Sequence, residues 1–134
     1  MITSIEKMTI YVRDEEEALR FHTEKQGFEK RMDLSFRPGT RWLTAGPKGG
    51  GGPEIVLQNP AGWQDPEGAA RLSAQIGKRP PIIFGTKNCR ETCDELKAKG
   101  VTILAEPQPR PYGVEAMFAD LYGNAFVLVE PKNG

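Results

Sequence analysis

The chain is poor in histidine, and it has no excess charge of either sign. Its 134 residues include one histidine, and 18 lysines and arginines balance 18 aspartates and glutamates. A single histidine argues against a histidine-rich metal site and against the serine–histidine pairing of a hydrolase triad. The charge balance also holds in each half of the chain, so binding to nucleic acid or to an anionic membrane is not favoured.

Long apolar runs are absent too. No segment approaches the roughly 20 consecutive apolar residues of a membrane-spanning helix, and residues 1–7 lack the apolar stretch of a signal peptide. The length suits one ordinary hydrophobic core rather than two independent ones. We therefore expect a soluble, cytoplasmic, single-domain protein.

Cysteine is scarce, with Cys89 and Cys93 four positions apart. This spacing places both side chains on one face of a helix, where the α-carbons are poorly oriented for a disulfide. The favoured interpretation is two small, partly buried helix residues. The alternative is that Cys89, close to a helix N-terminus, is a reactive thiol with a lowered pKa.

What the chain does contain is an internal repeat. Two helix-like runs begin at the capping residues Asp14 and Asn88, each followed by Glu three positions later, and they end at Gly27 and Gly100. An apolar, β-branched segment precedes each run, and several strand-like segments follow it. The pattern predicts two β-α-β-β-β modules that arose by duplication.

The predicted fold class is α+β, with the two modules in a pseudo-two-fold repeat that forms a curved, partly open mixed sheet around a cleft. The first module covers about residues 5–59 and the second about 81–131. The Pro- and Gly-rich connection at 60–80 is long enough to act as a lid. The predicted strands are 6–13, 28–36, 40–45, 54–58, 82–87, 101–105, 114–119 and 125–130, and the predicted helices are 15–26, 69–76 and 89–98.

Three segments carry a family resemblance: Glu17-Ala18-Leu19-Arg20-Phe21 leading to Gly27-Phe28-Glu29, then Arg41-Trp42-Leu43-Thr44, and last Phe118-Ala119-Asp120-Leu121-Tyr122-Gly123-Asn124. In this order the chain resembles the vicinal oxygen chelate superfamily from about residue 5 to residue 131. That superfamily includes glyoxalase I, extradiol dioxygenases, fosfomycin-resistance enzymes and bleomycin-resistance proteins. The resemblance implies the fold and leaves the activity open, because the group performs several unrelated chemistries.

The metalloenzymes of this superfamily hold a metal ion with four side chains from the first and last strands of the two modules. The resemblance places these positions at Thr9, Glu54, Ile83 and Val127. Only Glu54 is a good ligand for a divalent ion, so we expect no metal and no cofactor. The one histidine, His22, lies in the first predicted helix and is expected to pack away from the cleft.

The cleft is expected to be mainly apolar, with a few directional polar groups. The residues expected to bind a ligand there are Thr9, Tyr11, Trp42, Glu54, Gln58, Ile83, Tyr112, Phe118 and Val127, with Arg41 or Arg110 as polar neighbours. For any one of the aromatic residues, a place in the core or in a dimer interface is at least an equally good prediction. Trp63, in the connection, is expected to be a lid contact or an interface anchor.

These residues predict a metal-free small-molecule-binding protein, similar to the bleomycin-resistance type, with Glu54 facing a cationic group of the ligand. The alternative is a metal-independent lyase or isomerase in which Glu54 is the general base, since a carboxylate in an apolar cleft can abstract a proton next to a carbonyl. A metal-dependent glyoxalase or dioxygenase is the third interpretation. The expected partners are a small-molecule ligand and a second copy of the chain in a homodimer, because open sheet edges need covering.

Overall fold

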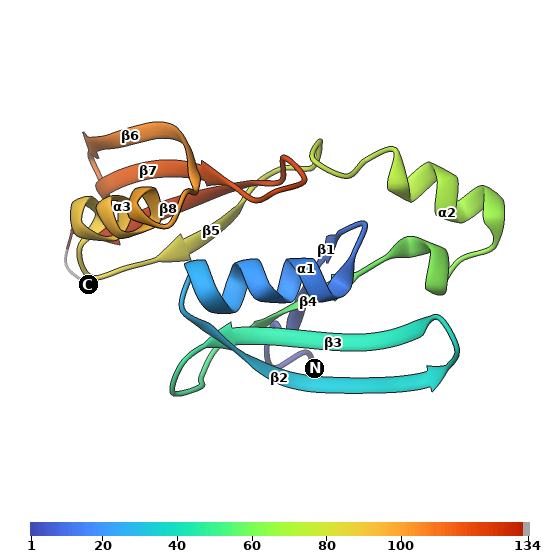
Figure 1. Ribbon diagram of the computed structural model, residues 1–134. Coiled ribbons are helices and arrows are strands. Elements are labelled where there is room, and N and C mark those ends of the chain that lie inside the picture. Colours follow the sequence, from blue (N-terminus) through green and yellow to red (C-terminus); the bar gives the residue numbers. More distant parts are fainter. Residues whose placement is uncertain (133–134) are drawn as a thin grey trace. The chain divides into compact units, whose positions relative to one another are not determined.

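The computed structural model describes residues 1–132, and they form two compact units, Met1–Ile76 and a second unit that begins at Gly77 (Figure 1). Each unit contains one four-stranded mixed sheet and a helix that packs on it. The division leaves residues 60–76 of the predicted connection with the first unit. In the part of the chain that the structure describes, no helix is long and apolar enough to span a membrane.

The first unit has the sheet order β1-β4-β3-β2, in which β1 is parallel to β4 and the other neighbours are antiparallel. Its elements are β1 (Lys7–Tyr11), α1 (Glu15–Arg20), the π-helix η1 (Phe21–Lys25), β2 (Phe28–Arg37), β3 (Thr40–Pro47), β4 (Glu54–Gln58), the 3-10 helix η2 (Pro60–Gly62) and α2 (Pro66–Ser73).

The second unit repeats this order as β5-β8-β7-β6, again with one parallel pair, β5 and β8. Its elements are β5 (Ile82–Gly85), α3 (Cys89–Ala98), β6 (Thr102–Arg110), β7 (Gly113–Ala119) and β8 (Ala125–Pro131). The matching strand orders confirm the predicted α+β fold of two β-α-β-β-β modules, and neither sheet is closed.

The helix ends follow the sequence signals. The side chain of Asp14 accepts a hydrogen bond from the Glu17 amide at 3.0 Å, and the side chain of Asn88 accepts one from the Glu91 amide at 3.0 Å. Such caps satisfy amide groups that have no partner inside the helix. Gly27 and Gly100 follow the helical runs with φ near +83°, a left-handed conformation that a side chain disfavours.

The core of each unit lies between its sheet and its helix. In the first unit Val12, Leu43 and Leu57 are fully buried, together with Ala18 and Leu19 of α1. In the second unit the corresponding core residues are Phe118, Phe126 and Leu128 from the sheet and Cys93 and Leu96 from α3. Burial of a large apolar side chain stabilises the fold by about 1.5–3 kcal/mol, so these contacts hold each helix on one face of its sheet.

Three elements depart most clearly from the prediction. The first helix changes to π geometry at Phe21, and this wide turn lets the consecutive side chains of Phe21 and His22 both be buried. Helix α2 begins at Pro66 instead of residue 69, because Asp65 caps it by accepting from the Gly68 amide at 2.7 Å. Strand β6 continues to Arg110 despite two prolines, which an edge strand tolerates.

Candidate functional site

The first sheet has one face covered by α1 and one face that α1 leaves open. Successive side chains of a strand point to opposite faces, and side chains of paired residues share a face. Thr9 pairs with Val56, Val56 with Thr44, and Thr44 with Met32. Trp42 lies two residues from Thr44 on the same strand, so it points to the same side.

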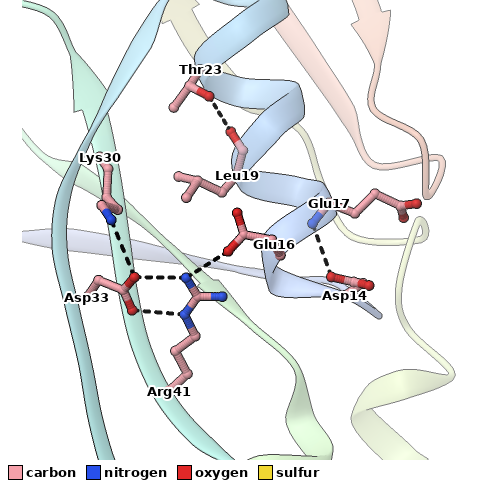
Figure 2. Close-up of polar contacts among 8 residues, drawn as sticks. All are labelled: Asp14, Glu16, Glu17, Leu19, Thr23, Lys30, Asp33 and Arg41. Carbon is pink, nitrogen blue, oxygen red and sulfur yellow. Dashed lines mark hydrogen bonds and ion pairs between the residues drawn. The ribbon is translucent and has the colours of Figure 1, made fainter.

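The side of α1 is identified by Arg41, the neighbour of Trp42 in β3. Its guanidinium binds both carboxylate oxygens of Asp33 at 2.8 Å and donates to Glu16 of α1 at 3.0 Å (Figure 2). Arg41 therefore lies on the face that α1 covers, and it is not the polar neighbour of Trp42 that we expected. Trp42 and Thr44 point to the opposite face, which we call the open face. By strand pairing, the residues that share this face are Lys7, Thr9, Tyr11, Met32, Leu34, Trp42, Thr44, Glu54, Val56 and Gln58.

Three aromatic rings meet on the open face, and we call them the aromatic cluster: Phe36, Trp42 and Trp63. The Trp63 ring contacts Phe36 with centroids 5.7 Å apart and planes at 90°, and it contacts Trp42 at 6.0 Å and 70°. Edge-to-face pairs of this kind are favourable because the positive edge of one ring meets the negative face of the other. Phe36 is 61% exposed, so the cluster presents aromatic surface to its surroundings.

Beside the aromatic cluster, the open face carries Tyr11 and Gln58, which pair between β1 and β4. Both side chains are partly exposed. The Tyr11 phenol and the Gln58 amide are therefore accessible polar groups on the same face as the rings. Thr44 is fully buried on this face, and its hydroxyl has no hydrogen-bond partner among residues 1–132. The face is therefore mainly apolar with a few polar atoms, which is the usual composition of a small-molecule site.

Glu54 lies in a group of charges on β1, β2 and β4. Its carboxylate is 3.9 Å from the Lys7 ammonium and 3.6 Å from the Arg31 guanidinium, and Arg31 is 3.3 Å from Glu29. A side chain at Gly46 would lie 3.2 Å from the Arg31 guanidinium, so glycine leaves room for it. These surroundings differ from the isolated carboxylate in an apolar cleft that we expected for a general base.

In the second unit, Ile83 pairs with Val127, and Val127 pairs with Met117, so these side chains share one face of the sheet. Phe118 follows Met117 and points to the other face, where it contacts Phe126 with ring centroids 5.3 Å apart. It is only 1% exposed. Phe118 is thus a core residue under α3, and our expectation that it lines a site together with Ile83 and Val127 is wrong.

Tyr112 lies in the turn between β6 and β7 and is 52% exposed. Its hydroxyl donates to Glu115 at 2.7 Å, and the Arg110 guanidinium donates to the other carboxylate oxygen of Glu115 at 3.1 Å. The two hydrogen bonds keep the pKa of Glu115 below its usual value. The structure thus brings Tyr112 and Arg110 together on the carboxylate of Glu115, a residue that the sequence analysis did not single out.

The repeat clarifies the expected metal positions. Thr9 pairs with Val56 in the first unit as Ile83 pairs with Val127 in the second, so Val56 is the counterpart of Val127. Glu54 pairs with Lys7, one step away on the same face. Two valines, an isoleucine and a threonine supply no set of donors for a divalent ion. Within residues 1–132, no three His, Cys, Asp or Glu side chains are grouped to hold a metal.

His22 belongs to η1 and is fully buried, packed away from the open face as we expected. Its Nδ1 is 2.9 Å from the Gln26 side-chain oxygen, and its ring contacts Phe21 and Phe28. Burial lowers the pKa of His22 to about 4, since the imidazolium would lose its hydration. His22 is therefore a neutral core residue at neutral pH.

Cys89 and Cys93 belong to α3 and are also fully buried. Burial raises the pKa of the Cys89 thiol to about 11 and also raises that of Cys93. A reactive cysteine requires a lowered pKa and access to solvent. The structure favours two small core residues over the reactive thiol.

Phe36 was missed by sequence reasoning, although a signal for it exists. Met32, Leu34 and Phe36 are apolar residues at alternate positions of an edge strand, and all three are exposed. Such a pattern on a strand with a free edge indicates a surface that contacts something else. Trp63 was expected in a contact role, but its partners Phe36 and Trp42 are distant in sequence.

Comparison with known proteins identifies the family of this chain. The model of the Glyoxalase/Bleomycin resistance protein/Dioxygenase superfamily matches residues 4–128. The uncharacterized protein YetH of Bacillus subtilis (strain 168) is 31% identical over 97% of this chain and 100% of its own length.

Two solved structures also match over nearly the whole chain. UcmS2 is 38% identical with a TM-score of 0.84, over 97% of this chain and 99% of its own. TnmS3, an antibiotic binding protein from Streptomyces sp. CB03234, is 28% identical with a TM-score of 0.80, over 98% of both chains. The protein therefore belongs to the Glyoxalase/Bleomycin resistance protein/Dioxygenase superfamily.

Proposed function

We propose that the protein binds a small molecule with a flat aromatic part, holds it against the aromatic cluster of the first unit, and does not transform it. The observation that carries the proposal is the convergence of Phe36, Trp42 and Trp63 on the face that α1 leaves open. Aromatic faces offer a large apolar contact and stack on planar ligands. Tyr11 and Gln58 supply hydrogen-bonding groups on the same face.

The likeness to TnmS3, an antibiotic binding protein, supports an antibiotic-like natural product as the ligand class. The match covers nearly all of both chains, so the two proteins share more than a local motif. Among the remaining residues that we expected at the site, Thr9, Ile83, Tyr112 and Val127 stay proposals as ligand contacts.

We further propose that binding needs no metal ion or cofactor. Of the positions that the resemblance assigns to metal ligands, Thr9, Ile83 and Val127 provide no strong donor, and neither does Val56, the counterpart of Val127. Glu54, the fourth, is paired with Lys7 and Arg31. The general-base alternative loses its support, since Glu54 lies between Lys7 and Arg31. A cytoplasmic location and a homodimeric state remain part of the proposal.

A ligand screen tests the proposed function. We expect a member of a panel of aromatic antibiotics, bleomycin included, to raise the melting temperature, because a ligand at 100 times its Kd stabilises the native state by about 2.7 kcal/mol. The same compound should change the intrinsic fluorescence, since both tryptophans of the chain belong to the aromatic cluster.

Two variants decide where the compound binds. By isothermal titration calorimetry, Trp63→Ala should weaken binding at least about tenfold, which corresponds to about 1.4 kcal/mol. The control, Glu54→Gln, should leave the affinity unchanged because the Glu54 carboxylate is paired with Lys7 and Arg31. Unchanged affinity in Trp63→Ala, or loss of affinity in Glu54→Gln alone, would contradict the proposal.

A further inference from the structure

The segment that carries Trp63 is fixed to the first unit at several points. Asn59 begins it by accepting from the Ala61 amide at 3.0 Å and by donating from its side chain to the Arg13 carbonyl at 3.0 Å. Pro60 is fully buried. Thr40, at the start of β3, donates its hydroxyl to the Gly62 carbonyl at 2.9 Å. In Figure 1 this segment follows β4 and lies at the same end as the turn between β2 and β3.

Gly62 makes a close contact with this turn. A Cβ atom built on Gly62 would lie 1.8 Å from the carbonyl oxygen of Gly39, so the backbones approach too closely for any side chain. Gly39 itself has φ +82°, a value that glycine adopts readily in a tight turn. The two glycines and the Thr40 hydrogen bond therefore form one contact, which we call the hairpin latch: Gly39, Thr40 and Gly62.

The hairpin latch lies next to Trp63 in the chain and next to the strands that carry Phe36 and Trp42. The indole nitrogen of Trp63 is covered and has no hydrogen-bond acceptor among residues 1–132. The orientation of the ring is therefore not fixed by a hydrogen bond from its indole nitrogen to any described residue. What holds the ring is its contact with two aromatic neighbours and the backbone position one residue earlier, at Gly62.

We propose that the hairpin latch sets the position of Trp63, and that Gly62 and Thr40 are positioning residues for the ligand site. The inference rests on the proposed function, because it assigns these residues to the aromatic cluster. It replaces the expected movable lid with a preformed wall. A wall that is ordered before binding spares the ligand the entropic cost of ordering it, so the latch contributes to affinity without touching the ligand.

The first test displaces the latch and follows the two indoles without any ligand. Indoles about as close as Trp42 and Trp63, with centroids 6.0 Å apart and planes at 70°, give an exciton couplet in far-ultraviolet circular dichroism. We expect Gly62→Ala to abolish this couplet and to raise acrylamide quenching of tryptophan fluorescence at least twofold. Trp63→Phe defines the spectrum without the couplet.

Gly85→Ala is the matched control, since a Cβ at Gly85 would have no neighbouring atom of residues 1–132 within 4 Å. It should keep the wild-type couplet. If Gly62→Ala does not fold, Thr40→Val removes only the hydroxyl donor and should weaken the couplet, whereas Thr40→Ser should restore it. A wild-type couplet in folded Gly62→Ala, or in Thr40→Val, would overturn the latch.

The second test measures binding of proflavine, a planar tricyclic dye, by fluorescence anisotropy. We expect Gly62→Ala to raise the Kd at least fivefold and Gly85→Ala to leave it unchanged. Loss of the couplet with an unchanged Kd would keep the latch but overturn its role in binding, and with it the placement of the proposed function on the aromatic cluster. An unchanged couplet with a raised Kd would instead overturn the latch and keep that placement.

Discussion

Single side chains in this protein are assigned to a face by strand pairing. Trp42 and Arg41 are neighbours in β3, yet one joins the aromatic cluster and the other holds α1. In β7, Met117 and Phe118 likewise point to opposite faces of their sheet. A shift of one residue in register exchanges the two faces of a strand, and register depends on partners that are distant in sequence. This is why the sequence predicted Trp42 and Trp63 as contact residues but misplaced Arg41 and Phe118.

A single side chain, His22, makes the free energy of unfolding depend on pH. Its pKa is about 4 in the folded protein, against the ordinary value of 6.5 in an unfolded chain, so the unfolded chain takes up a proton first as the pH falls. The stability is complete above pH 6.5 and should fall by about 3 kcal/mol between pH 6.5 and pH 4, since each pKa unit is worth 1.36 kcal/mol. Urea unfolding at a series of pH values measures this loss.

The variant His22→Gln provides the comparison for this pH dependence. Glutamine cannot titrate, so the free energy of unfolding of His22→Gln should vary less between pH 6.5 and pH 4. The pKa of Asp33, which its hydrogen bonds to Arg41 hold below the usual value, affects stability only at lower pH. An equal slope in wild type and His22→Gln over this range would show that His22 is not the group responsible.

At the scale of elements, a charged network joins α1 to the β2–β3 hairpin. Arg41 bridges Asp33 and Glu16, and Lys30 lies 3.5 Å from Asp33 (Figure 2). Replacement in Arg41→Met leaves two carboxylates without their common cation. We expect a loss of about 1 kcal/mol in the free energy of unfolding, the upper range for partly exposed pairs. Urea unfolding gives this value.

The pair of Lys97 and Glu106 serves as the control for that network. The two groups are 2.6 Å apart but largely exposed, and among residues 1–132 neither forms a second ion pair. Lys97→Met should therefore leave the unfolding midpoint unchanged, because isolated exposed pairs contribute little. Equal effects of Arg41→Met and Lys97→Met would mean that the network adds nothing beyond a surface pair.

Helices and strands were predictable to different degrees. The caps at Asp14 and Asn88 and the glycines after each helix are local signals, and the structure follows them. The start of α2 was missed because Asp65-Pro66 also fits a turn, and only the Gly68 hydrogen bond identifies it as a helix start. Strand β6 was ended too early because its prolines are acceptable only once it is known to be an edge.

At the scale of the whole molecule, the exposed edge strand β2 leads us to predict a homodimer. Met32, Leu34 and Phe36 are all more than 40% exposed on a strand whose outer edge is unpaired in its own sheet. Proteins usually cover such edges. We expect light scattering at micromolar concentration to give twice the chain mass of 14.8 kDa. A monomer under these conditions would contradict the prediction.

The two repeats have become unequal. Thr44 pairs with Val56 in the first sheet as Met117 pairs with Val127 in the second. The residue two positions before Thr44 is Trp42, and the residue two positions before Met117 is Glu115. The duplicated frame thus carries an indole in one copy and a carboxylate bound to Tyr112 and Arg110 in the other. The proposed binding function therefore belongs to one of the two repeats. A ligand should therefore occupy one site per chain, however many copies assemble.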